Sequence, residues 1–134
     1  MDRSKIKVMV VDDEEDITYF TARILQFDGF TVFKAYDGAG ALEIFHKEHP
    51  QICLLDAHLG LSKIDGMDVL EEVKRTDKSV ECIMITRITD YETEDRARRL
   101  GVKHYLIKPL AMEIWLSKVH EIAAKLEERN IPHG

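Results

Sequence analysis

Four runs of apolar residues in this chain each end in polar side chains that could share one reaction. Asp12 and Asp13 follow the first run, Asp56 follows another, and Thr86 and Lys108 end or follow two later runs. Three carboxylates at one place repel one another and are costly to bury unless a cation neutralises them. Mg²⁺ suits such a site, because it commonly combines one or two carboxylates with phosphate oxygens and water.

A carboxylate in such a site can act as a nucleophile on phosphorus and form an acyl phosphate. The charge of Lys108 would neutralise phosphoryl oxygens during the transfer. The hydroxyl of Thr86 could donate a hydrogen bond to one of those oxygens, so its position would report whether a phosphoryl group is present. These residue types therefore predict phosphoryl transfer.

The elements that must position these side chains alternate between short apolar runs, which are typical of buried strands, and segments whose apolar residues repeat with the period of a helix. Short apolar or β-branched runs predict five strands, at Ile6–Val11, Thr31–Ala35, Ile52–Leu55, Val80–Thr86 and His104–Ile107. Segments of helical period lie between and after them, and the first has an apolar stripe of Ile17, Phe20, Ile24 and Leu25. Such alternation requires parallel strands with helices on both faces, so we expect an α/β doubly wound five-stranded sheet with five helices. In that fold, ligands bind beyond the carboxyl ends of the strands.

The bulk composition indicates one ordinary globular domain. The chain has 134 residues, of which 45% are hydrophobic and 33% are charged. Its net charge of −6 disfavours direct binding to nucleic acid or to anionic lipid. The apolar run at Val8–Val11 is too short for a signal peptide or a membrane span, so we expect a cytoplasmic protein that does not enter the membrane. Cys53 and Cys82 lie in predicted strands, where cysteine usually acts as a small buried hydrophobe.

Four sequence motifs resemble those of the response-regulator receiver domain of two-component signal transduction, whose fold is that of the chemotaxis regulators. They are Val10-Val11-Asp12-Asp13-Glu14, Leu54-Leu55-Asp56, Met84-Ile85-Thr86 and Tyr105-Leu106-Ile107-Lys108-Pro109. Their order and their placement at strand ends make the match specific. The resemblance implies a flavodoxin-like strand order of 2-1-3-4-5 and a receiver domain over residues 1–129, with residues 130–134 as a tail or the start of a linker.

The resemblance also implies roles for individual residues at the reactive edge. Asp56 would be the phospho-acceptor, phosphorylated by a sensor histidine kinase or a histidine phosphotransfer protein. Asp13, Asp56 and the backbone carbonyl of His58 would bind Mg²⁺ directly, and Asp12 would act largely through water. The domain would assist its own phosphorylation and dephosphorylation without being a turnover enzyme.

Other residues of the motifs would convert phosphorylation into a signal. Lys108 would pair with the phosphate, and Pro109 would follow it in a peptide bond that is often cis in this family. Thr86 and Tyr105 would reposition together when the domain is phosphorylated. The resulting change would leave through the fourth helix, fifth strand and fifth helix, and a homodimer on that surface is the expected active form.

Two departures from the family pattern keep an alternative open. The loop of residues 57–65 is longer than usual and lacks the family's proline, and Arg87 follows Thr86 where a small residue is usual. Arg87 would either screen the pocket or bind phosphate. The alternative is therefore a pseudo-receiver that serves only as a protein-interaction module. Two other functions fit the sequence less well. A dehalogenase-like phosphatase would require a second acid at the position of His58. A flavodoxin-like protein would bind a phosphate-containing cofactor, whose phosphate the acids of residues 12–16 would repel.

Overall fold

The computed structural model describes residues 2–129 and contains one parallel sheet in the order β2-β1-β3-β4-β5. The strands are β1 (Lys7–Val11), β2 (Thr31–Ala35), β3 (Ile52–Leu55), β4 (Glu81–Thr86) and β5 (His104–Ile107). The helices are a short 3₁₀ turn (Arg3–Lys5), α1 (Glu15–Phe27), α2 (Gly38–Glu48), α3 (Gly66–Thr76), α4 (Tyr91–Arg99) and α5 (Met112–Arg129). The predicted doubly wound α/β fold, its strand order and its five helices are confirmed.

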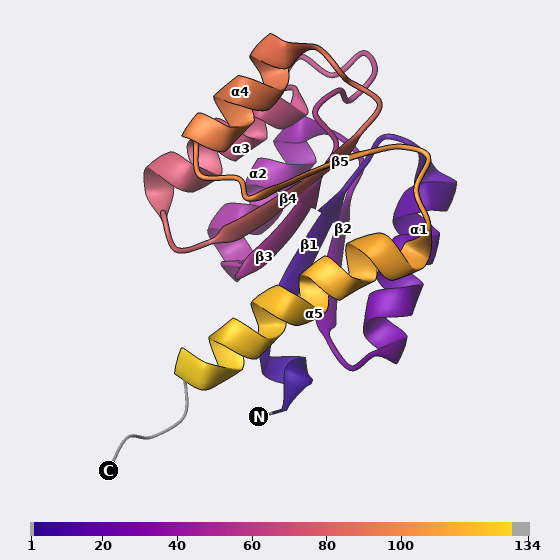
Figure 1. Cartoon of the computed structure of the whole chain (residues 1–134), viewed down its shortest axis with the longest axis vertical. Coiled ribbons are helices and arrows are strands. Elements are labelled where there is room, and N and C mark those ends of the chain that lie inside the picture. Colours follow the sequence, from indigo (N-terminus) through magenta and orange to yellow (C-terminus); the bar gives the residue numbers. More distant parts are fainter. Residues whose placement is uncertain (1, 130–134) are drawn as a thin grey trace.

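The sheet is covered on both faces, as a parallel sheet requires. Helices α1 and α5 lie on one face, and α2, α3 and α4 lie on the other (Figure 1). Each face has its own apolar core: Phe45, Leu55 and Val69 belong to the core under α2–α4, whereas Val8, Ile83 and Val119 belong to the core under α1 and α5. The three central strands are therefore apolar on both faces, which leaves polar side chains at their ends.

Helix α1 contradicts one detail of the predicted pattern. Phe20 is 63% exposed, although the apolar stripe placed it toward the core. The buried residues of α1 are Thr18, Ala22 and Leu25. Thr18 can be buried because its hydroxyl donates a hydrogen bond to the backbone carbonyl of Asp12 at 2.9 Å, and the small Ala22 lets the helix approach the sheet. This rotates Phe20 to the solvent side.

Other differences are small. Strands β1 and β4 begin one residue later than predicted, at Lys7 and Glu81. Cys53 and Cys82 are both free and buried, as expected, and lie opposite each other on β3 and β4. Within residues 2–129, no helix is both long enough and apolar enough to cross a membrane.

Candidate functional site

The polar residues predicted to meet at the carboxyl edge of the sheet do meet there. Asp12 follows β1, Asp56 follows β3, Thr86 is the last residue of β4, and Lys108 follows β5. Carboxylate oxygens of Asp12, Asp13 and Asp56 all lie within 4.8 Å of one another. Asp12 and Asp56 are only 4% and 8% exposed, whereas Asp13 is exposed. The cluster is thus a carboxylate site of the kind that could hold a metal ion.

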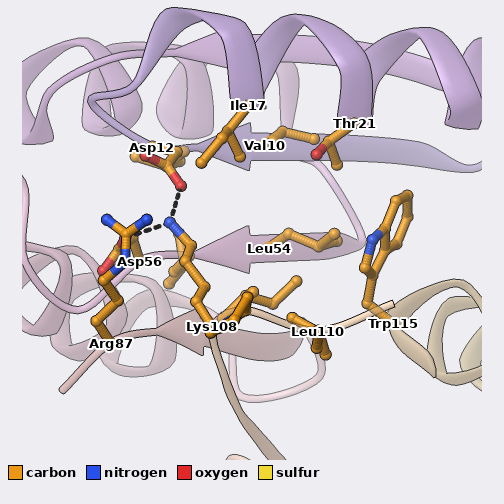
Figure 2. Close-up of a pocket in the computed structure, with 14 residues that line it drawn as sticks. Val10, Asp12, Ile17, Thr21, Leu54, Asp56, Arg87, Lys108, Leu110 and Trp115 are labelled. Carbon is orange, nitrogen blue, oxygen red and sulfur yellow. Dashed lines mark hydrogen bonds and ion pairs between the residues drawn. The ribbon is translucent and has the colours of Figure 1, made fainter. Parts of the chain in front are cut away.

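Lys108 connects the two buried carboxylates of the cluster. Its Nζ lies 2.5 Å from Oδ2 of Asp12 and 2.8 Å from Oδ2 of Asp56 (Figure 2). Burial raises the pKa of Asp12 even though Lys108 stabilises its charged form. Burial works against the charge of Lys108, but its hydrogen bonds to Asp12 and Asp56 outweigh that effect and raise the pKa of the ammonium. Lys108 therefore stays protonated and neutralises part of the acidic charge.

The second oxygen of Asp56 is held by two donors. Oδ1 accepts a hydrogen bond from the hydroxyl of Thr86 at 2.7 Å and another from the backbone N–H of His58 at 3.0 Å. Gly66, at the start of α3, approaches the backbone of Asp56 so closely that a Cβ on Gly66 would lie 1.7 Å from the carbonyl oxygen of Asp56. Only glycine fits at this position. These contacts fix Asp56 from both its side chain and its backbone.

The loop between β3 and α3 folds back toward the acidic cluster. Gly60 has φ +59°, and a Cβ there would lie 2.8 Å from Oδ2 of Asp13. The loop is anchored to α2, because the hydroxyl of Ser62 accepts the backbone N–H of Gly38 at 3.2 Å. The imidazole of His58 is exposed, and its Nδ1 lies 3.9 Å from Oδ1 of Asp65. The long loop of residues 57–65 therefore forms a rim beside Asp13.

A chain of hydrogen bonds leads from Asp56 to Tyr105. The hydroxyl oxygen of Thr86 accepts the backbone N–H of Ile88 at 3.2 Å, and the hydroxyl of Tyr105 donates to the carbonyl of Ile88 at 2.8 Å. Tyr105 is buried, and burial together with the nearby acids Asp90, Glu94 and Asp56 raises its pKa to about 12. The two residues expected to act together are thus connected through one residue of the β4–α4 loop.

Arg87 lies over the site but is paired with a residue that sequence reasoning did not identify. Its Nη1 lies 2.8 Å from Oε1 of Glu14, and the two side chains are 66% and 44% exposed. Arg87 lines the same pocket as Asp56 and Lys108, and its guanidinium overlaps Asp56 in the view of Figure 2. The only available signal for this contact was that Glu14 is the third acid in the run after β1. The peptide bond between Lys108 and Pro109 is cis, as the family resemblance implied.

Comparison with known proteins agrees with this fold. The model of the response regulator receiver domain matches residues 8–120. A probable transcriptional regulator ycf27 of Porphyridium aerugineum is 30% identical over 134 residues, which is 97% of this chain and 55% of that protein. The chain therefore belongs to the response regulator receiver domain family. It spans about half the length of this curated relative.

Solved structures show the same architecture. A CheY-like response regulator receiver domain protein from Methanospirillum hungatei JF-1 superposes with a TM-score of 0.86 at 25% identity, covering 93% of this chain and 98% of that one. The receiver domain of NtrX from Brucella abortus superposes with a TM-score of 0.79 at 29% identity, covering 87% and 98%. Both similarities extend over nearly the whole of the compared domain.

Proposed function

We propose that this domain is a phosphorylation switch and that Asp56 accepts a phosphoryl group from a phosphohistidine of a sensor histidine kinase or histidine phosphotransfer protein. The observation that supports this most is the placement of the Asp56 carboxylate between the ammonium of Lys108 and the hydroxyl of Thr86. In the reaction, one oxygen of Asp56 attacks phosphorus as the P–N bond to the donor breaks. The imidazole nitrogen keeps the electron pair of that bond, and Asp56 becomes an acyl phosphate.

Mg²⁺ fits the donor set of this edge. Asp12, Asp13 and Asp56 bring three negative charges together against the single positive charge of Lys108, and a divalent ion would balance the remainder. Asp13, Asp56 and the backbone carbonyl of His58 would hold the ion directly, with Asp12 acting through water. When bound, the ion would neutralise phosphoryl oxygens during transfer.

The remaining site residues would stabilise the phosphate and transmit its presence. Lys108 would exchange its hydrogen bond to Asp56 for one to a phosphoryl oxygen. Thr86 would turn its hydroxyl away from Asp56 and donate to a second phosphoryl oxygen. The backbone of Ile88 is hydrogen-bonded to the hydroxyls of both Thr86 and Tyr105. Movement of Thr86 would therefore decide whether Tyr105 keeps its hydrogen bond to Ile88. Pro109 would hold the start of the β5–α5 connection beside Lys108. The face formed by α4, β5 and α5 would then carry the signal.

We further propose that residues 1–129 form the domain and that residues 130–134, which lie outside the described residues, are a tail or the start of a linker. Several relatives are described as transcriptional regulators, so the output of this protein would be control of transcription through a further domain or a partner. The net charge of −6 makes direct binding of nucleic acid by this domain unfavourable. The protein would act in the cytoplasm, where kinases of this class present their phosphohistidine.

The decisive test is intact mass after incubation with acetyl phosphate and Mg²⁺. One phosphoryl adduct is expected on the parent protein and none on Asp56→Asn protein. The matched control is Asp16→Asn, which removes an exposed carboxylate from the first turn of α1 and should leave the adduct unchanged. An equal adduct on Asp56→Asn protein would refute the assignment.

Beryllofluoride tests the pseudo-receiver alternative, because it mimics an acyl phosphate on a carboxylate. A phosphorylation switch should bind beryllofluoride in the presence of Mg²⁺ and show resonance shifts at Asp56, Thr86 and Lys108. A pseudo-receiver should not bind it. Absence of both the mass adduct and beryllofluoride binding would leave the interaction module as the function.

A further inference from the structure

A cavity of about 250 Å³ lies between α1 and α5, and Asp12 and Asp56 of the acidic cluster are part of its lining. Strand residues form its floor, and residues of α1 and the start of α5 face each other across it (Figure 2). Much of the lining is apolar, and it includes Val10, Leu54, Ile85, Ile17 and Leu110. An apolar cavity of about 150 Å³ is already enough to hold benzene. The present cavity therefore has room for a molecule of one or two small rings.

Two polar groups in the cavity lack protein partners. Trp115 is only 7% exposed, yet no atom in residues 2–129 accepts a hydrogen bond from its indole N–H. The hydroxyl of Thr21, on the α1 side, likewise has no partner within that range. In Figure 2 the indole nitrogen and the Thr21 oxygen are both on the cavity side of their side chains. No side-chain nitrogen or oxygen that is shut off from solvent lacks a partner in the described residues, so both of these groups reach solvent within the cavity. An indole N–H can only donate, and a ligand that displaces this solvent must replace the lost acceptor. A ligand would therefore need an acceptor atom.

The charges at the mouth favour a neutral ligand. Lys108 borders the cavity, but its ammonium is already bonded to both Asp12 and Asp56. Arg87 also borders it, and its guanidinium is paired with Glu14. No uncommitted cation is therefore present among the described lining residues to attract an anion. A cationic ligand would in turn have to compete with Lys108 for the same carboxylates.

From these observations we propose that the cavity is a binding site for a small neutral ring compound that carries a carbonyl oxygen. The ring would fill the apolar space over Val10 and Leu54, and the carbonyl would accept the indole N–H of Trp115. The hydroxyl of Thr21 would donate to a second acceptor on the ligand or remain solvated. Because Asp56 is part of the lining, the proposal concerns the unphosphorylated domain, in which Lys108 is bonded to Asp12 and Asp56.

The probe is acetophenone, and it is compared with two compounds that have a similar ring. Ethylbenzene has no carbonyl, and benzoate carries a charged carboxylate. Trp115 is the only tryptophan in the chain, so its indole N–H gives a single resonance that reports the contact directly. Acetophenone should shift that resonance saturably. Ethylbenzene should bind about fivefold more weakly, which corresponds to one hydrogen bond of about 1 kcal/mol, and benzoate should bind more weakly still.

Variants locate the binding site. Thr21→Met should fill the space and abolish binding, whereas the matched control Thr76→Met alters an exposed threonine at the end of α3 and should leave affinity unchanged. Trp115→Phe retains an aromatic ring and removes the N–H. Its ketone binding can be followed through the fluorine signal of 4-fluoroacetophenone. We expect this variant to bind the ketone about fivefold more weakly than the parent and to bind ethylbenzene with unchanged affinity. Melting curves of all variants establish that they are folded.

Several results would overturn this proposal. One is the absence of any saturable shift of the indole resonance at millimolar acetophenone in folded parent protein. Another is undiminished binding to Thr21→Met protein, which would place the ligand elsewhere. Equal affinity for acetophenone and benzoate would contradict the preference for a neutral ligand. Equal affinity for acetophenone and ethylbenzene would contradict the role of Trp115.

Discussion

The hydroxyl of Thr86 donates a hydrogen bond to Oδ1 of Asp56 at 2.7 Å, and its oxygen accepts the N–H of Ile88 at 3.2 Å. One buried side chain thus binds the proposed phospho-acceptor on one side and the β4–α4 loop on the other. A phosphoryl group on Asp56 would offer Thr86 a different acceptor. Because Ile88 also holds Tyr105, a change at Thr86 would affect the conformation of the loop.

Replacement of Thr86 by valine should separate the hydrogen bonds from the shape of the side chain. Thr86→Val leaves the N–H of Ile88 and one oxygen of Asp56 without this partner, so we expect the free energy of unfolding to fall by about 1–3 kcal/mol. Thr86→Ser retains the hydroxyl and serves as the control, with only the smaller loss from removing a methyl group. Urea unfolding measures both. A Thr86→Val protein more stable than Thr86→Ser would contradict this role of the hydroxyl.

Crowding of the carboxylates predicts that one of them opposes folding when no metal is present. Asp13→Asn should weaken Mg²⁺ binding, because it removes a proposed ligand, and should leave the metal-free melting temperature unchanged or higher. Calorimetric titration with Mg²⁺ and thermal unfolding in chelator measure the two effects. Asp16→Asn is again the matched control and should change neither. A large fall in the metal-free melting temperature of Asp13→Asn protein would show that Asp13 stabilises the fold.

The sequence predicted the reactive edge more completely than it predicted the contacts around it. Asp12, Asp56 and Lys108 were identifiable because apolar strands deliver them to the same edge of a parallel sheet. The pair formed by Arg87 and Glu14 joins two loops that are 73 residues apart, and no local pattern encodes that distance. The exposure of Phe20 depended on how closely α1 approaches the sheet, which side-chain hydrophobicity alone does not determine.

Tyr105 should ionise later than an ordinary tyrosine. Its pKa is raised to about 12, chiefly by burial, whereas the unfolded chain should show the ordinary value of 10.0. Because the folded state holds the phenol proton more tightly, the stability contributed by Tyr105 is fully present below pH 10 and is lost as the pH rises toward 12. NMR titration of the tyrosine ring carbons can measure this, with Tyr105→Phe to assign the signal. Ionisation of Tyr105 near pH 10 in folded protein would contradict the prediction.

Arg87 should prolong the phosphorylated state. Its guanidinium is tethered to Glu14 beside the pocket, from where it could hydrogen-bond a phosphoryl oxygen and obstruct the water needed for hydrolysis. We expect Arg87→Ala protein to gain the phosphoryl group faster and lose it faster than the parent. The control Arg75→Ala removes an arginine paired with Glu72 on α3. A lifetime in Arg87→Ala protein equal to or longer than that of the parent would rule out retention by Arg87.

Activation should produce a dimer through the face formed by α4, β5 and α5. In the isolated domain, each arginine of the α4 cluster already has an acidic partner in the same chain: Arg96 pairs with Glu71, Arg98 with Glu94 and Arg99 with Asp95. These exposed pairs are individually weak, so they can be exchanged for acids of a second copy at little cost. The expected state is therefore monomer without beryllofluoride and a salt-sensitive dimer with it.

Sedimentation at several protein and salt concentrations would test this association. Arg98→Glu should weaken the beryllofluoride-dependent dimer by placing acid against acid, since α5 contributes Glu121 and other carboxylates. Arg75→Glu is a charge-matched control on α3 and should leave the dimer intact. High salt should also weaken association, because it screens exposed charges. If beryllofluoride binds but changes neither the mass in solution nor the hydrogen exchange around Tyr105, the output must use another surface of the domain.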